Sequence, residues 1–204
     1  AEALALAPDG RFHVGFERVG EVWRFDVARE GLGARAQAVA IPPSLRRLTH
    51  NKGIEAMSFA PPASPMAGAL LVVAERSHGQ GPTTAAALVG GPSPGDLAFA
   101  RRDEFDVSDC AFLPDGDLIV LERRFRWRDG VAVRLRRVPA RDIRPGAILQ
   151  GASIFAATMA QEIDNLEGLA LHRDAAGRIV LTLVSDDNFS WLQRTVLLQF
   201  RLDG

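Results

Sequence analysis

The chain has 204 residues, of which 47% are hydrophobic, and its 24 lysines and arginines against 25 aspartates and glutamates give a net charge of −1. No apolar stretch approaches the roughly 18 residues that a membrane-spanning helix requires, so no transmembrane segment is expected. The basic residues are scattered among acids instead of gathered on one face, which argues against a nucleic-acid partner. Composition therefore predicts a single globular domain over residues 1–204.

Four β-hairpins are expected in chain order, at residues 2–17, 55–75, 109–122 and 167–186. In each of them a short apolar run is followed by a turn rich in Pro, Asp or Gly and by a second apolar run. An acidic residue opens each hairpin and another closes it, and successive opening acids are 53, 54 and 58 residues apart. Repeats of this length are typical of propeller blades, solenoids or arrays.

Further strands are expected after the hairpins, at residues 21–27, 31–42, 83–91, 96–105, 131–139 and 195–202. The stretch 141–163 is longer and is expected to be partly helical around residues 155–159. Four strands per repeat predict an all-β fold, a β-propeller of four-stranded antiparallel blades with the first strand of each hairpin innermost. Cys110, the only cysteine, lies in an apolar strand and is expected to pack in the core.

The last repeat shows only three strands. A closed propeller has no exposed sheet edges, and the missing strand of such a ring normally comes from the other end of the chain. We therefore expect N-terminal blades upstream of Ala1, so that the roughly four blades seen here belong to a six-bladed ring, although four-bladed rings also exist.

The paired acids of all repeats are expected at one end of the ring, because a hairpin brings the start of its first strand beside the end of its second. Carboxylate and amide oxygens are the ligands that calcium prefers. The expected calcium ligands are Asn51, Glu55, Glu75, Asp109, Glu122, Asn165, Glu167 and Asp186. Alternatively, these acids pair with the arginines that follow them, Arg18, Arg76 and Arg123, and so hold neighbouring blades together.

Candidate catalytic and substrate-binding residues lie near the same end. His50 and His78 are expected in loops there and are candidates for a general base. Lys52, Arg76 and Arg123 are candidates for holding an anionic group of a substrate. The chain contains no nucleophile elbow, no zinc motif of the H-E-x-x-H type and no P-loop.

Several segments resemble a known family. Residues 165–171 (NLEGLAL), 183–189 (LVSDDNF) and 195–200 (TVLLQF) resemble the C-terminal signature of the phytase-like family described as having esterase-like activity of phytase. Residues 52–56 (KGIEA) and 113–125 (LPDGDLIVLERRF) are similar to its earlier motifs. The resemblance implies a β-propeller, a hydrolase activity and, because such proteins are often exported in bacteria, a periplasmic or secreted location.

Two functional hypotheses follow. In the first, cations bound by the acidic ring polarise a phosphate or carboxylate ester of a small molecule and activate water for its hydrolysis. In the second, the propeller is a non-catalytic binding or scaffold protein with a structural calcium ion. The fold alone does not decide between them, because propellers have many functions.

Overall fold

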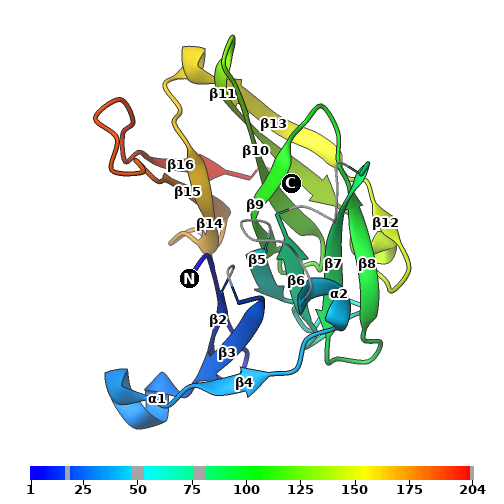
Figure 1. Ribbon diagram of the computed structural model, residues 1–204. Coiled ribbons are helices and arrows are strands. Elements are labelled where there is room, and N and C mark those ends of the chain that lie inside the picture. The colour runs from blue at the N-terminus through cyan, green and yellow to red at the C-terminus, as the bar shows by residue number, and fades with distance from the viewer. Residues whose placement is uncertain (17–18, 47–52, 76–80, 203–204) are drawn as a thin grey trace.

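A computed structural model of the protein describes residues 1–16, 19–46, 53–75 and 81–202. Its strands form four small sheets that follow one another along the chain and are arranged as the blades of a β-propeller (Figure 1). The predicted all-β propeller is thus confirmed. Among the described residues, no helix is both long and apolar enough to cross a membrane.

Blade one and blade two each begin with a β-hairpin. Blade one consists of β1 (Ala3–Leu6), β2 (Phe12–Phe16), β3 (Glu21–Phe25) and β4 (Gln37–Val39), with α1 (Val27–Glu30) and η1 (Gly31–Gly33) before β4. Blade two follows α2 (Pro43–Arg46) and consists of β5 (Ile54–Phe59), β6 (Leu70–Ala74), β7 (Thr83–Val89) and β8 (Gly95–Ala100). A short strand from blade three, β12 (Ile148–Leu149), pairs in parallel with β8 at its outer edge.

Blades three and four complete the described chain. Blade three consists of β9 (Asp106–Phe112), β10 (Leu118–Arg126), β11 (Gly130–Val138) and β13 (Ala152–Thr158), with η2 (Ala140–Asp142) after β11. Blade four follows η3 (Met159–Gln161) and consists of β14 (Leu166–Arg173), β15 (Ile179–Ser185) and β16 (Leu197–Arg201). Within each blade, strands that are consecutive in this order pair antiparallel.

The first strands of the blades are innermost, as predicted, because β1 contacts β5, β5 contacts β9 and β9 contacts β14. The expectation of partial helix around residues 155–159 is wrong. Residues 155–158 lie in β13, which pairs with β11, and Met159 begins the short 3-10 helix η3, which Thr158 caps. Pairing with a sheet edge overrides the helix preference of an alanine-rich segment.

Three apolar clusters fill the junctions between neighbouring blades. Ile54 and Val72 pack between blades one and two, Phe99 and Val120 between blades two and three, and Leu121 between blades three and four. Because side chains alternate along a strand, Val120 and Leu121 lie on opposite faces of blade three. Cys110 is 3% exposed in the second of these clusters, which confirms its packing role.

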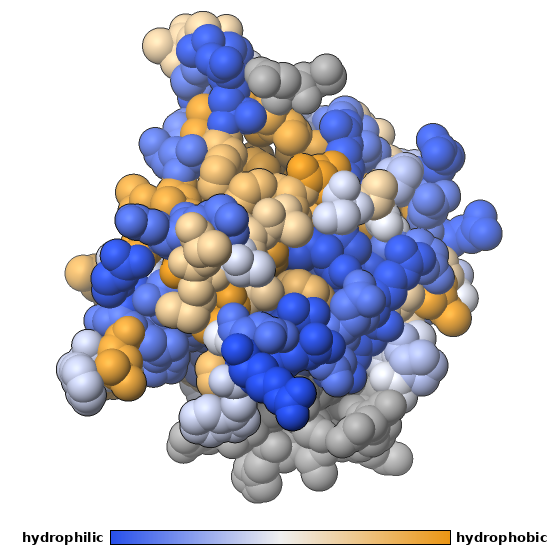
Figure 2. Space-filling model, turned by 90° about the horizontal axis from the view of Figure 1, so that it is seen from above, coloured by the Kyte–Doolittle hydropathy of each residue, from blue (hydrophilic) through white to orange (hydrophobic). Residues whose placement is uncertain are grey.

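Apolar side chains also reach the surface. Leu4 and Leu6 of β1 are 64% and 58% exposed, on the face of blade one that does not pack on blade two. Figure 2 shows apolar areas between charged ones on the face of the molecule seen from above. The expectation that further blades complete a six-bladed ring stays a prediction.

Candidate functional site

All four hairpins open at the same end of the propeller. Gly15 and Ile54 lie at the open ends of the first two hairpins, and a Cβ on Gly15 would be 2.8 Å from Ile54 Cγ2. Near the turns of the second and third hairpins, the Phe112 N–H donates to Ser58 Oγ at 3.1 Å. Arg123 of blade three reaches Glu167 of blade four at 3.1 Å. We call the end where the first strands begin and the second strands finish the open end.

A β-bulge at the open end decides which residues are equivalent between blades. In blades two and four the extra residue of the inner strand is Glu55 and Glu167, because the pairing skips from Ile54 to Ala56 and from Leu166 to Gly168. In blade three the pairing skips Ser108. Ser108, and not Asp109, therefore occupies the position of the two glutamates, and Arg123, and not Glu122, occupies that of Glu75 and Asp186.

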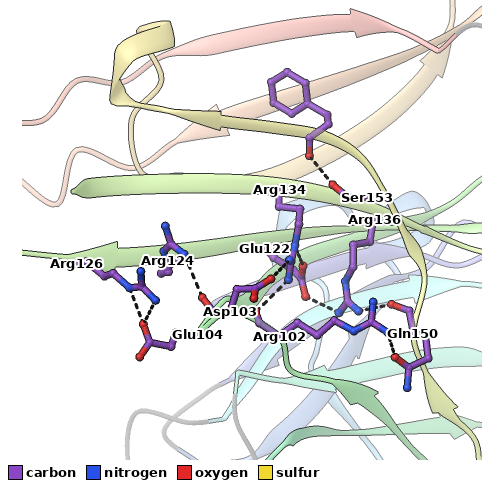
Figure 3. A network of polar contacts seen from close by, with 11 residues as sticks. Arg102, Asp103, Glu104, Glu122, Arg124, Arg126, Arg134, Arg136, Gln150 and Ser153 are labelled. Atoms are coloured by element: carbon purple, nitrogen blue, oxygen red, sulfur yellow. Dashed lines mark hydrogen bonds and ion pairs between the residues drawn. The ribbon is translucent and has the colours of Figure 1, made fainter. Parts of the chain in front are cut away.

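Because of this offset, Glu122 does not take the position that Glu75 and Asp186 have at the open end. Its side chain lies on the face of blade three opposite to that of Arg123, since neighbouring side chains on a strand point to opposite faces. Glu122 is 1% exposed, and its Oε2 accepts a hydrogen bond from Arg134 Nε at 2.7 Å (Figure 3). Its Oε1 accepts from Arg136 Nη2. Arg136 is also 1% exposed, and its burial lowers its pKa. Both carboxylate oxygens of Glu122 are thus engaged by arginines; we call these three residues the Glu122 cluster.

The Asp109 side chain accepts hydrogen bonds from two backbone N–H groups. Its Oδ1 accepts a hydrogen bond from the Cys110 N–H at 2.8 Å, and its Oδ2 accepts from the Leu169 N–H at 2.7 Å. The second bond joins β9 of blade three to β14 of blade four. Loss of hydration raises the pKa of Asp109 to about 7, against the lowering effect of the two N–H donors. Its carboxylate thus binds backbone at a blade junction.

Arg123 and Glu167 meet at the open end of the junction between blades three and four. Arg123 Nη1 lies 3.1 Å from Glu167 Oε1 and also donates to Asn165 Oδ1. Asn165, which is 2% exposed, donates from Nδ2 to Glu167 Oε1 at 2.7 Å and to the carbonyl oxygen of Asp186 at 3.4 Å. We call Arg123, Asn165, Glu167 and Asp186 the Glu167 cluster.

Opposing effects act on the pKa of the Glu167 carboxyl. Partial burial raises its pKa above the usual 4.5, and the negative charges of Asp186 and Glu2 raise it further. The Arg123 charge and the hydrogen bond from Asn165 act in the opposite direction. About a third of the Glu167 and Arg123 side chains stays exposed, so small molecules can reach both groups. A carboxylate of raised pKa beside a guanidinium can accept a proton while the guanidinium binds negative charge.

The other predicted site residues divide into two groups. Glu55 and Glu75 are half-buried at the open end of blade two, where the Glu75 N–H donates to the Gly53 carbonyl oxygen at 2.9 Å. His50, Asn51, Lys52, Arg76 and His78 lie outside the described residues. Among the described residues, no three His, Cys, Asp or Glu side chains gather into a group that could hold a metal ion.

Comparison with solved structures relates the chain to longer proteins. It is 14% identical to the PQQ-bound form of aldose sugar dehydrogenase from Streptomyces coelicolor, with a TM-score of 0.56, over 98% of this chain and 59% of that one. It is 12% identical to a protein of unknown function from Bacteroides caccae, with a TM-score of 0.45, over 98% of this chain and 60% of that one. The chain thus spans about 60% of the length of these two structures.

Sequence comparison is more specific about the family. No curated protein matches the chain. The model of the phytase-like family described as esterase-like activity of phytase matches residues 1–189, nearly the whole chain, from β1 to β15. The chain therefore belongs to this phytase-like family.

Proposed function

We propose that the protein hydrolyses phosphate or carboxylate esters of small molecules at the open end of the propeller. The observation that carries the proposal is the Glu167 cluster, in which a half-buried carboxylate of raised pKa lies 3.1 Å from a partly exposed guanidinium. The family to which the chain belongs supports ester hydrolysis as the reaction.

Glu167 acts as the general base in this proposal. Its carboxylate takes a proton from a water molecule, and the resulting hydroxide adds to the carbonyl carbon or the phosphorus of the ester. The bond to the leaving alkoxide then breaks, and Glu167 returns the proton to that oxygen, so that ester and water give acid and alcohol. A base whose pKa lies nearer the working pH accepts the proton more readily, which is the benefit of the raised pKa.

Arg123 supplies positive charge to the reacting group. Both of its contacts to the cluster use Nη1, whereas a guanidinium carries five N–H donors. The remaining donors bind the phosphate group or the negative charge that develops on a carbonyl oxygen. Preorganised donors of this kind stabilise the transition state more than the substrate. Asn165 holds both Arg123 and Glu167 in place from its buried position.

Calcium has no role in the proposed reaction and is used only as an addition in the experiment that tests it. The oxygens of Glu122 and Glu167 already face arginines, and the described carboxylates form no metal-holding group. These residues by themselves do not fit a calcium site, so no step involves the ion. The predicted ligand Asn51 lies outside the described residues.

The test is hydrolysis of 4-nitrophenyl acetate and 4-nitrophenyl phosphate by the wild type and by Glu167→Gln, with and without added calcium. We expect Glu167→Gln to lower kcat/KM about 100-fold or more, the usual contribution of a general base. The control is Glu21→Gln, because Glu21 is an exposed acid of β3 whose carboxylate accepts a hydrogen bond from Trp23. Equal activity of the two variants would refute the role of Glu167. If calcium raises Tm in a wild type that hydrolyses neither ester, the binding or scaffold hypothesis is correct.

Location is a separate part of the proposal. We propose a periplasmic or secreted protein, on the basis of the family resemblance. Cell fractionation with an antibody against the chain tests it, and recovery of the protein in the cytoplasm alone would contradict it.

A further inference from the structure

An exposed loop begins at the Glu167 cluster. It comprises residues 186–195, between β15 and β16, and projects from blade four, coloured orange to red in Figure 1. Its two ends are tied together, because the Ser185 N–H donates to the Val196 carbonyl oxygen at 3.0 Å and Ser185 Oγ donates to the Arg194 carbonyl oxygen at 2.7 Å. Asp164, which is 3% exposed, accepts from the Arg194 N–H at 2.9 Å. Compact loops with tied ends are frequently functional.

The interior of the loop is also fixed. Asp187 accepts hydrogen bonds from the Phe189 N–H at 2.9 Å and from Thr195 Oγ1 at 3.0 Å. Asn188 and Phe189 have φ angles of 50° and 53°, in the left-handed region that bulky residues seldom adopt. Such a backbone persists only where surrounding bonds impose it, and it is found preferentially at ligand sites. The loop therefore has a defined conformation.

This conformation holds three apolar side chains in water. Phe189 is 105% exposed, Trp191 91% and Leu192 70%. They lie within four consecutive residues of one loop. Neighbouring exposed apolar groups of this size usually mark a binding surface. The other exposed aromatic pair, Phe125 and Trp127 at the tip of the β10–β11 hairpin, makes an edge-to-face contact with ring centroids 5.5 Å apart.

The loop that carries the apolar side chains starts at the candidate site. Asp186, the first residue of the loop, accepts from Asn165 at its carbonyl oxygen, and its charge acts on Glu167. Phe189 is three residues further along, so its Cα lies within about 11 Å of that of Asp186. The bond from the Asn188 N–H to Asp186 Oδ1, at 2.9 Å, keeps the intervening chain turned back.

The chemistry of the loop indicates which substrates it suits. Phe189, Trp191 and Leu192 offer area for apolar groups, and burial of such a group stabilises a complex in proportion to that area. Asp186 and Asp187 place negative charge at the start of the loop, which disfavours a highly phosphorylated molecule there. We infer that loop 186–195 binds the apolar acyl or aryl group of a carboxylate ester whose carbonyl is held at the Glu167 cluster. This inference rests on the proposed function.

The test compares kcat/KM for 4-nitrophenyl octanoate with that for ethyl acetate, which has no large apolar group. The double variant Phe189→Ala/Trp191→Ala should lower the octanoate-to-acetate ratio about tenfold, through KM and not kcat, because the loop contacts no reacting atom. Trp191→Phe should retain the preference. Trp127→Ala is the matched control, an equally exposed tryptophan, and should leave the ratio unchanged. An unchanged ratio in the double variant would overturn the inference.

A binding measurement separates this inference from the proposed function. Calorimetric titration with 1-naphthylacetate should give a Kd at least tenfold higher for the double variant than for the wild type. If the wild type hydrolyses no ester but shows this loss of binding, the proposed function fails and the apolar subsite stands. Two outcomes would refute the subsite: a large drop in Tm of the double variant, which would show that the aromatic residues pack against protein, or loss of binding to phosphatidylcholine vesicles with unchanged naphthylacetate affinity.

Discussion

The Glu122 cluster and the Glu167 cluster lie on opposite faces of the same strand and differ in almost every physical respect. Glu122 and Arg123 are neighbours on β10, yet Glu122 faces blade two and Arg123 faces blade four. The first cluster is buried, and both oxygens of its carboxylate are bound by arginines. In the second cluster, about a third of the surface of the Arg123 and Glu167 side chains is exposed. Two similar sets of charges therefore differ in role: the first packs inside blade three, and the second is the proposed site of hydrolysis.

Burial explains why the Glu122 cluster is structural. Taking charges out of water costs several kcal/mol per ion, and only close, fully bonded partners offset that cost. Arg134 adds a contact to Asp103 at 3.0 Å and lies 4.3 Å from the centre of the Phe105 ring. These contacts connect β11 with the segment between blades two and three. A cluster so enclosed has no free donor or acceptor on Glu122 to offer to a substrate.

Removal of the Glu122 charge is expected to have the largest effect. Glu122→Gln removes the anion that Arg136 contacts and leaves Arg134 with the exposed carboxylate of Asp103. Breaking a buried pair in this way costs about 3–5 kcal/mol. Urea unfolding followed by circular dichroism measures the loss. Glu21→Gln should change the free energy of unfolding by less than about 0.5 kcal/mol, as surface substitutions do. A loss below about 1 kcal/mol in Glu122→Gln would remove the distinction between the two clusters.

Asp109 is expected to make stability depend on pH. Its pKa is about 7 in the folded protein, against an ordinary value of 3.8 for an aspartate. The folded state therefore binds more protons between these values, and the free energy of unfolding falls as pH rises from about 4 to about 7. The fall attributable to Asp109 is at most about 4 kcal/mol, at about 1.4 kcal/mol per unit. Unfolding of wild type and Asp109→Asn at several pH values measures it; parallel pH dependences would contradict the assignment.

The sequence predicts the fold well because the fold depends on patterns that are local. Alternating apolar runs, turns of Pro, Asp and Gly, and a spacing of 53 to 58 residues are enough to identify hairpins and blades. The expected inner strands agree with β1, β5, β9 and β14. The helical expectation for residues 155–159 failed because the pairing of β13 with β11 is a tertiary effect that composition does not reveal.

The site is less predictable for a related reason. The acids that open and close the hairpins look equivalent in the sequence. However, a bulge at Ser108 shifts blade three by one residue and places Arg123 where blades two and four have an acid. The alternative that arginines pair with neighbouring acids and hold adjacent blades together agrees with the contact of Arg123 with Glu167 between blades three and four. Glu122 also pairs with arginines, but these come from β11. An exposed apolar loop could be predicted from the sequence, since Phe189, Trp191 and Leu192 interrupt a polar segment.

The pH dependence of ester hydrolysis tests the central claim most directly, namely that Glu167 is the base and that its pKa is set by its neighbours. The acid limb of kcat/KM reports the pKa of the base in the free enzyme, and it should lie above pH 4.5. Asp186→Asn removes a charge that raises this pKa, so the limb should move to lower pH. Arg123→Gln removes a charge that lowers it, so the limb should move to higher pH. Limbs that stay in place, or that move in the same direction in both variants, would contradict the account.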